Sequence, residues 1–324
     1  MRGGAGGVVI GAPGPYPPFG DVPFLPAPPG WGVSGAARYA SGVRRVLGRL
    51  SLTGIEVHNR PEIALRVTMP GVPIMLWLNN DPRRMRQART PADRARITRR
   101  MHVVTASKWL RDCFQEGLPP TAITVIPNCL EPLPAPPTTR ENLIVFAGRV
   151  VADKGADAFV AACSRLLPGL PGWSAEMVGA DRFSPNAPDT PFLTALRPAA
   201  AAAGIVLRGH QPHDAVLDTM RRAAIVVVPS RWPEPFGLVA LEAMACGAAL
   251  ICSPRGGLPE VGGDVVLYAE PEPHALAAAI RTLAHDPARR AVMGRAGVAR
   301  AQGFGVDQAV AALVQLRQMG GGTL

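Results

Sequence analysis

The sequence contains little lysine, little cysteine and few aromatic side chains. Only Lys108 and Lys154 are lysines among 34 Lys and Arg residues, and aromatic residues make up 5% of the chain. The five cysteines form no Cys-x-x-Cys pair and the six histidines form no His-Glu-x-x-His pattern, which argues against a disulfide framework and a zinc motif. No apolar run reaches the ~18 residues of a membrane helix. We therefore expect free thiols and a cytoplasmic location.

Length and composition indicate a folded protein with more than one domain. The chain has 324 residues, of which 48% are hydrophobic and 18% charged, so it is neither a disordered chain nor a coiled coil. At roughly 150 residues per domain, this length predicts two domains.

The positive charge is confined to the first part of the chain. Residues 1–140 carry 18 Lys and Arg against 8 Asp and Glu, whereas residues 141–324 carry 16 of each. Eight of the arginines lie in residues 82–100. They are interpreted either as a solvated helix face or as a patch that binds an anionic membrane surface. No nucleic-acid-binding motif is present, so we expect no nucleic acid as partner.

The distribution of proline separates two α/β halves. Four prolines in residues 131–139 predict a linker, with an acceptor-side domain over residues 1–140 and a second domain over residues 141–324. Predicted strands are at 8–10, 55–57, 73–78, 102–105, 143–147, 174–178, 205–208, 225–229 and 249–253. Predicted helices are at 36–50, 93–100, 109–116, 156–167, 191–203, 214–223, 236–246, 287–301 and 306–318. This alternation predicts doubly wound parallel sheets, with ligands at the carboxyl ends of the strands.

The strongest functional signal is the segment of residues 229–247, which contains two glutamates eight positions apart. Glu234 lies in a short loop after a predicted strand, and a helix is predicted to begin near Phe236. The first N–H groups of such a helix have no partners within it, so they suit a diphosphate or sugar hydroxyls. Glu242 lies in an apolar stretch, where a carboxylate needs partners. The alternative is that Glu234 is a cap and Glu242 a solvated residue.

Two cations follow the first strand of the second half. Arg149 and Lys154 come after Gly148, which ends that strand. An arginine fork and a lysine point charge are suited to phosphate oxygens and would stabilise a leaving diphosphate. The alternative for Arg149 is a surface arginine among many.

Residues 142–318 resemble the catalytic half of family 4 retaining glycosyltransferases, which have the GT-B fold of two Rossmann-like parallel-sheet domains facing a cleft. The resemblance is carried by the Glu-x7-Glu segment and by the Gly-Arg…Lys-Gly segment at residues 147–155. The Gly-rich loop at 253–260 and the Ile-Pro-Asn turn at 126–128 agree with it.

The resemblance implies transfer of a sugar, with retention of configuration, from a nucleoside diphosphate sugar to a polysaccharide or a lipid-linked saccharide. It implies no cofactor, and no protein nucleophile, because the leaving phosphate itself serves as the base. It implies no metal, because Arg149 and Lys154 would stabilise the charge of the leaving diphosphate and no Asp-x-Asp motif is present. The residues implied at the donor site are Arg149 and Lys154 for the phosphates, Glu234, Pro235, Phe236, Gly237 and Leu238 for the sugar, Glu242 for the ribose, and Gly209 and His210 near the base.

The first half matches the family less well. His58 and Asn79 follow two predicted strands and are acceptor-side candidates, but many family members have a histidine where Asn79 falls. Residues 1–35 are rich in Gly and Pro where the family has a strand, a Gly-rich loop and a helix, so we expect a shortened first domain and association with the inner membrane face at most peripherally. A donor-binding homologue or partner subunit without activity stays open, as does a nucleotide-sugar epimerase.

Overall fold

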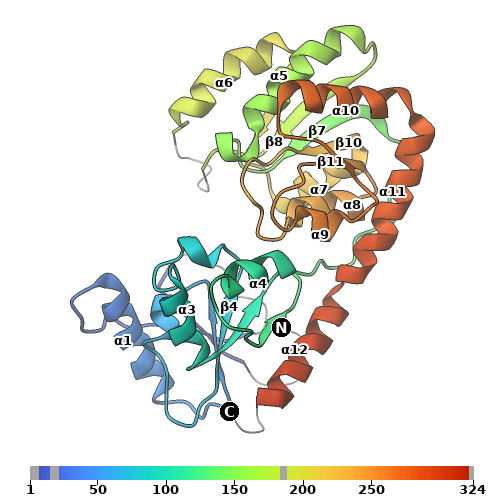
Figure 1. The fold of residues 1–324 in the computed structure, drawn as a ribbon. Helices are drawn as coiled ribbons and strands as arrows, with labels where there is room; N and C mark the ends of the chain where they lie inside the picture. The colour runs from blue at the N-terminus through green and yellow to red at the C-terminus, as the bar shows by residue number, and fades with distance from the viewer. Residues whose placement is uncertain (1–6, 15–21, 183–187, 321–324) are drawn as a thin grey trace. The chain divides into compact units, whose positions relative to one another are not determined.

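The computed structural model describes residues 7–14, 22–182 and 188–320, which belong to two compact units (Figure 1). The first unit comprises Met1–Pro127 together with Asp307–Leu324, and the second comprises Asn128–Val306. Residues 1–6 and 15–21 of the Gly- and Pro-rich first segment lie outside the described residues. Among the helices that are described, none has the length and apolar character of a membrane span.

The second unit is built on a six-stranded parallel sheet with the order β12-β11-β10-β7-β8-β9. Its strands are β7 (Glu141–Ala147), β8 (Ser174–Val178), β9 (Ile205–Gly209), β10 (Ala223–Val228), β11 (Ala249–Cys252) and β12 (Leu267–Tyr268). Its helices are η2 (Ala152–Lys154), α5 (Ala156–Leu166), η3 (Leu167–Gly169), α6 (Pro191–Ala202), α7 (His213–Arg222), α8 (Leu238–Ala245), α9 (Leu258–Gly262), α10 (Pro273–His285), α11 (Pro287–Ala301) and η4 (Gln302–Phe304).

Apolar strands explain why this sheet is covered on both faces. All six residues of β10 are buried, as expected for a parallel strand between two helical layers. In Figure 1, α5, α6 and α10 cover one face and α7 and α8 cover the other. Ile144 and Phe146 of β7 pack in the core with Phe159 of α5. The predicted doubly wound sheet is confirmed.

The strand order reverses between β7 and β10. From β7 the chain builds outward through β8 and β9, and it then returns to place β10 on the other side of β7. Such a reversal leaves a crevice outside the carboxyl ends of the two strands, which is where ligands bind in sheets of this kind.

The first unit has a four-stranded parallel sheet of order β3-β4-β5-β6 and a separate parallel pair, β1-β2. Its strands are β1 (Val9–Gly11), β2 (Phe24–Pro26), β3 (Ile55–His58), β4 (Ile74–Leu78), β5 (His102–Thr105) and β6 (Ile123–Val125). Its helices are α1 (Gly35–Leu47), α2 (Pro61–Ala64), η1 (Pro82–Arg84), α3 (Pro91–Thr98), α4 (Lys108–Gln115) and α12 (Val306–Gly320). As predicted, Ser107 caps α4, because its hydroxyl accepts a hydrogen bond from the Leu110 N–H.

The last helix and the Pro-rich segment fall in different units from those that the sequence predicted. Leu316 of α12 is buried with Val104 and Ile126, and Arg317 donates to Glu56, so α12 packs in the first unit although α11 packs in the second. The carbonyls of Pro134 and Ala135 accept from Arg221, which fixes the Pro-rich segment to the second unit. The chain therefore passes between the units at 127/128 and 306/307 and not after residue 140.

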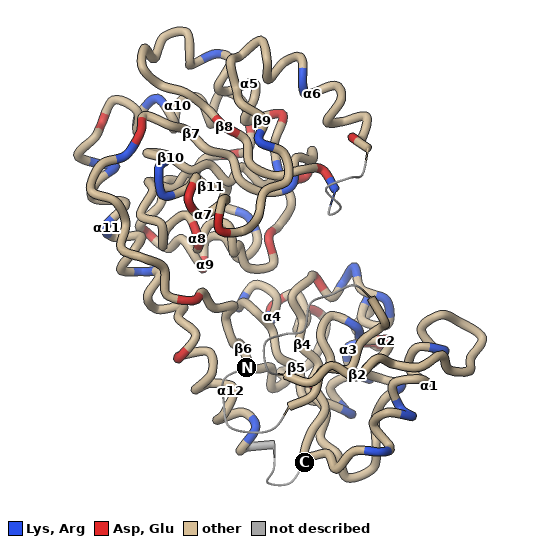
Figure 2. The backbone as a smooth tube through the Cα atoms, turned by 180° about the vertical axis from the view of Figure 1, so that it is seen from behind, with Lys and Arg blue, Asp and Glu red and all other residues tan. Residues whose placement is uncertain are grey.

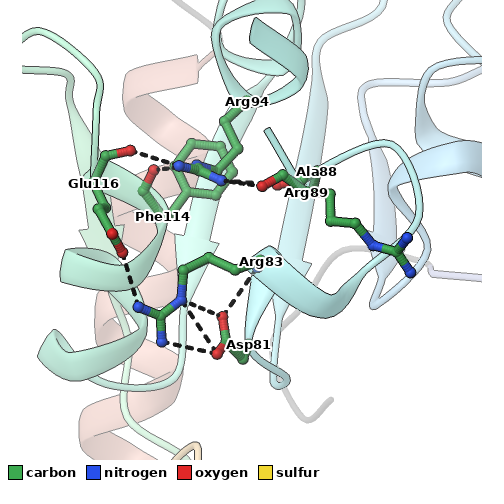
Figure 3. A network of polar contacts seen from close by, with 7 residues as sticks. All are labelled: Asp81, Arg83, Ala88, Arg89, Arg94, Phe114 and Glu116. Atoms are coloured by element: carbon green, nitrogen blue, oxygen red, sulfur yellow. Dashed lines mark hydrogen bonds and ion pairs between the residues drawn. The ribbon is translucent and has the colours of Figure 1, made fainter. Parts of the chain in front are cut away.

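Part of the Arg-rich segment is structural (Figure 3). Arg94 is 2% exposed, and its guanidinium donates to the carbonyls of Phe114, Ala88, Arg89 and Glu116. A cation in that position fastens α3 to the end of α4, so Arg94 is unavailable to a membrane surface.

Arg83 also holds the fold together. It pairs with Asp81 and Glu116 and lies 5.9 Å from the ring centroid of Trp109. Hydrogen bonds and charge from Arg83 outweigh desolvation and lower the pKa of Asp81. Exposed arginines of the segment are Arg84, Arg86, Arg89, Arg99 and Arg100.

We expect Arg94→Ala to lower the free energy of unfolding by about 2–4 kcal/mol, because it leaves four buried or half-buried carbonyls without their donor. Urea denaturation followed by circular dichroism measures the change. Arg86→Ala is the control, since its exposed side chain should change stability by less than about 0.5 kcal/mol. Equal stability of the two variants would contradict the structural role of Arg94.

Candidate functional site

The candidate site lies at the carboxyl ends of β7 and β10, where the chain following one strand meets the chain following the other. Gly155 ends η2 with φ 70°, and a Cβ placed on it would lie 2.0 Å from the carbonyl oxygen of Pro229. Only glycine permits both this conformation and this approach. The η2 turn and the loop after β10 are therefore in backbone contact.

An ion pair crosses this contact. Lys154 Nζ lies 2.5 Å from Glu234 Oε1, and the Ser230 hydroxyl donates to the same oxygen at 2.7 Å. Glu234 is 9% exposed, so its carboxylate depends on these donors for the solvation that it loses. The structure thus brings together two predicted site residues that are 80 positions apart.

Backbone hydrogen bonds fix the loop that carries Glu234. The carbonyl of Asp153 accepts from the N–H groups of Arg231 and Trp232, and Arg231 forms an ion pair with Asp157 on α5. On the other side, the Gly257 N–H donates to the Glu234 carbonyl at 2.6 Å. The loops after β7, β10 and β11 therefore hold the Glu234 backbone from two directions.

The helix after this loop begins two residues later than predicted. Gly237 is the N-cap of α8 with φ 111°, and Leu238 is the first helical residue. A Cβ at position 237 would lie 2.7 Å from Leu258 Cδ2, so this position favours glycine both by its conformation and by its close contact. Phe236 is 2% exposed and packs edge-on against Phe304. Among the described residues, no hydrogen-bond acceptor is found for the N–H groups of Phe236, Gly237 and Leu238.

Glu242 has a partner that the sequence did not reveal. Its Oε1 lies 2.9 Å from Nε2 of His213, the first residue of α7, and its side chain is 13% exposed. His213 is itself exposed at the surface of the unit. The two glutamates of the motif are thus both largely buried and both hydrogen-bonded.

The ends of β8 and β9 continue the same edge of the sheet. The N–H of Gly148 donates to Val178, and the N–H of Gly179 donates to Gly209. A Cβ on Gly179 would lie 2.0 Å from the Gly148 carbonyl oxygen, so this edge is formed by backbone at close range. His210 follows Gly209 and is exposed, and Arg149 follows Gly148 and is also exposed.

Arg208 is engaged elsewhere on this edge. Its guanidinium makes two hydrogen bonds to the carboxylate of Glu176 on β8. These bonds outweigh desolvation and lower the pKa of Glu176.

In the first unit, His58 and Asn79 lie at the carboxyl ends of neighbouring strands β3 and β4. The His58 ring stacks on Trp77 with a centroid distance of 5.5 Å. Desolvation, opposed in part by the charge of Glu56, lowers the pKa of His58. Asn59, with φ 54°, accepts the Asn79 N–H at 2.7 Å, which ties the two strand ends together. The predicted acceptor-side residues are therefore neighbours within this unit.

Four of the five cysteines are buried thiols and are poor nucleophiles. Burial raises the pKa of Cys113 to about 11 and those of Cys163, Cys246 and Cys252 to about 12, so these thiols stay protonated near neutral pH. All five cysteines are free. Within the described residues no group of three or more His, Cys, Asp or Glu side chains is arranged to hold a metal ion.

Taken together, the site offers a lysine, two carboxylates and unpaired backbone N–H groups at the reversal of a parallel sheet. N–H groups at a helix start and a lysine suit phosphate oxygens. Carboxylates suit hydroxyl donors. The chemistry of this set suits a ligand that carries both phosphate and hydroxyl groups, and the whole edge belongs to a doubly wound domain.

Solved structures of glycosyltransferases share the fold. The chain superposes on Anabaena HepE in complex with UDP-glucose with a TM-score of 0.75 and 19% identity, covering 92% of this chain and 86% of that one. The glycosyltransferase from Rickettsia africae gives a TM-score of 0.76 and 16% identity, covering 94% of this chain and 86% of that one. The fold is GT-B, an α/β architecture of parallel sheets.

The sequence comparisons then give the family. The profile described as "Glycosyl transferases group 1" matches residues 134–300, so the chain belongs to this family of transferases. It is 36% identical over 167 residues to a D-inositol 3-phosphate glycosyltransferase of Segniliparus rotundus, covering 51% of this chain and 37% of that protein. It is 34% identical over 212 residues to a glycogen synthase of Mycobacterium tuberculosis, covering 61% of this chain and 48% of that protein. The chain therefore spans about half or less of these relatives.

Sequence reasoning missed three residues that shape this site. Ser230 lies in the segment of residues 229–247, four positions before Glu234, and this short spacing could have indicated its role. Gly179 and His213 gave no local signal, because each acts on a residue from another strand or helix.

We expect Gly155→Ala to lower the free energy of unfolding by about 2–4 kcal/mol, because the new methyl group would collide with the Pro229 carbonyl in addition to its backbone strain. Gly172→Ala is a matched control: Gly172 has φ 78° but nothing within 4 Å of a Cβ, so only about 1 kcal/mol of strain is expected. Urea denaturation measures both. Equal losses would mean that the contact between η2 and Pro229 is not close in solution.

Proposed function

We propose that this chain is a retaining glycosyltransferase of the family 4 type, which moves a sugar from a nucleoside diphosphate sugar to a saccharide acceptor. The observation that carries the proposal is the contact of Lys154 with Glu234 at the reversal of the sheet. This contact puts a phosphate-binding cation beside a hydroxyl-binding carboxylate. A nucleoside diphosphate sugar needs both at the bond between its phosphate and its sugar.

Each part of the donor has a chemically matched group in the second unit. Arg149 and Lys154 bind the diphosphate, and Glu234 with the N–H groups of Phe236, Gly237 and Leu238 binds the sugar. Pro235 joins Glu234 to Phe236 in the same loop. Family membership and the fold shared with a UDP-glucose complex support this assignment.

Nucleoside recognition is proposed for the residues that surround this centre. Glu242 accepts hydrogen bonds from the ribose hydroxyls. Its Oε1 is held by His213, so Oε2 is the oxygen offered to the ribose. Gly209 and His210, at the end of β9, flank the base.

The chemistry needs charge stabilisation more than a protein nucleophile. The bond between the anomeric carbon and the phosphate oxygen breaks while the acceptor oxygen bonds to the same face of that carbon. The acceptor proton passes to the leaving phosphate, and configuration is retained. Arg149 and Lys154 stabilise the negative charge that develops on the diphosphate, so no metal is required.

A second candidate function is a donor-binding subunit without transferase activity. Asn79 motivates it, because an amide cannot serve as a cation or a general base where many family members have histidine. His58, stacked on Trp77 beside the Asn79 strand end, is the residue that would compensate in an active enzyme. Binding of a nucleotide sugar without transfer to any acceptor would favour this candidate.

We expect Lys154→Met and Glu234→Gln each to reduce sugar transfer by at least roughly 100-fold, because they remove a charge from the donor centre. A screen of UDP-, GDP- and ADP-sugars by calorimetry identifies the donor, and proton NMR of the product gives the anomeric configuration. Glu131→Gln is the control, since Glu131 is exposed and outside the centre.

Melting curves show whether each variant is folded before its activity is compared. Near-normal turnover by folded Lys154→Met or Glu234→Gln would contradict the proposed donor centre. A product of inverted configuration would contradict the retaining mechanism, and activity lost on addition of EDTA would contradict metal independence.

The acceptor is proposed to be a polysaccharide or a lipid-linked saccharide, the latter reached at an anionic membrane surface. The basic stretch from η1 through α3 supports this, and Figure 2 shows blue Lys and Arg positions around α3. Arg86, Arg89, Arg99 and Arg100 of this stretch are exposed. Each basic side chain near anionic lipid contributes about 1 kcal/mol.

We expect anionic vesicles to retain the protein at low salt and to release it at high salt. Replacing Arg86, Arg89 and Arg99 together by Glu should abolish retention in a flotation assay. The same change at Arg165, Arg281 and Arg289, which are exposed in the second unit, keeps the net charge equal and should have little effect. Equal loss of vesicle retention in both triple variants would mean that retention depends on net charge and not on the position of these arginines.

A further inference from the structure

A second pocket lies at the opposite edge of the six-stranded sheet from the donor centre. It has a volume of about 620 Å³ and is lined by residues at the amino ends of β7, β10 and β11, by the Pro-rich segment and by α11. Arg140 precedes β7, Ala224 is near the start of β10, and Ala249 begins β11. This volume falls within the range of small-molecule sites.

Arg140 brings the first positive charge to this pocket. Its guanidinium donates to the carbonyls of Met220, Arg221, Ala223 and Cys246, all of them neutral acceptors. Burial lowers the pKa of Arg140. A half-buried cation that is held only by dipoles is left without a neutralising charge.

Arg290 on α11 brings the second charge. Nη1 donates to the carbonyls of Leu283 and Ala284, and the guanidinium carbon lies 5.1 Å from the ring centroid of Trp173. Its Nε and Nη2 have no partner among the described residues. Burial, opposed in part by the charge of Asp286, lowers the pKa of Arg290.

Arg295 on α11 completes the set. Its side chain is exposed and makes no hydrogen bond or ion pair with any described residue. The pocket lining within the described ranges includes no Asp or Glu. Gly294 packs so closely that a Cβ there would lie 2.4 Å from the Gly247 carbonyl oxygen, so part of the wall is backbone.

We propose that this pocket is a second ligand site, which binds a small molecule bearing a phosphate or diphosphate group. Arg295, together with Nε and Nη2 of Arg290, offers guanidinium N–H groups that phosphate oxygens accept, and Arg140, whose Nη atoms donate to carbonyls, adds a third positive charge beside them. Two of the three are anchored by the fold, so little side-chain entropy is lost on binding. The site is on the other edge of the sheet from Lys154 and does not depend on the proposed transferase activity.

Pyrophosphate is the probe, and calorimetry on Lys154→Met separates this site from the donor centre. We expect Lys154→Met to bind pyrophosphate with a Kd below about 1 mM, weakening as salt is added. Adding Arg295→Glu should weaken binding by at least roughly tenfold. Adding Arg289→Glu instead should not, because Arg289 is exposed on the same helix but does not line the pocket.

Arg295 is exposed, so both double variants should keep the melting temperature of Lys154→Met, which is checked first. Absence of pyrophosphate binding by Lys154→Met would overturn the proposal. Equal affinity of the Arg295→Glu and Arg289→Glu double variants would also overturn it, because binding would then be independent of the pocket. Neither outcome bears on sugar transfer, which is measured separately.

Discussion

The contact between Lys154 and Glu234 is the interaction on which the candidate site of the second unit depends. It joins the chain after β7 to the chain after β10, the two strands between which the sheet reverses. A nearly buried carboxylate beside a lysine is stable only if the surrounding backbone is held at a fixed distance. Gly155 provides that distance by bringing η2 against Pro229, and Ser230 supplies the further hydrogen bond that the carboxylate needs. Removing either partner would leave an uncompensated charge in the crevice.

In the second unit, the fold decides where the positively charged side chains lie, and the net charge of the unit does not indicate it. Residues 141–324 are neutral overall, yet cations occur at both edges of the six-stranded sheet. At the carboxyl edge, Lys154 forms an ion pair with Glu234, so its charge is balanced. At the amino edge, Arg140 and Arg290 donate to carbonyl oxygens, which solvate a cation without neutralising it. The two edges therefore differ in electrostatic character: the lysine at the carboxyl edge is paired with a carboxylate, whereas the arginines of the amino-edge pocket keep their net positive charge.

Local patterns predicted most of the elements but not which unit they join. Strands β7 to β11 and helices α5 to α8 and α11 of the second unit follow from periodicity, which acts over a few residues, whereas α9, α10 and β12 were not predicted. The assignment of α12 to the first unit depends on Leu316 meeting Val104 and Ile126, and no pattern within α12 encodes that contact. The Arg-rich segment shows the same limit: Arg94 is buried and Arg86 is exposed, although both occur in the same run of arginines.

The sequence by itself determined the fold class, the alternating order of most strands and helices, and the presence of two glutamates eight positions apart. These features depend on residue type and short spacing. The tertiary structure decided that Lys154 meets Glu234, that His213 holds Glu242, and that three arginines surround one pocket. Each of these contacts joins residues from separate strands or helices, and the folded sheet brings them together through backbone approaches that no single segment specifies.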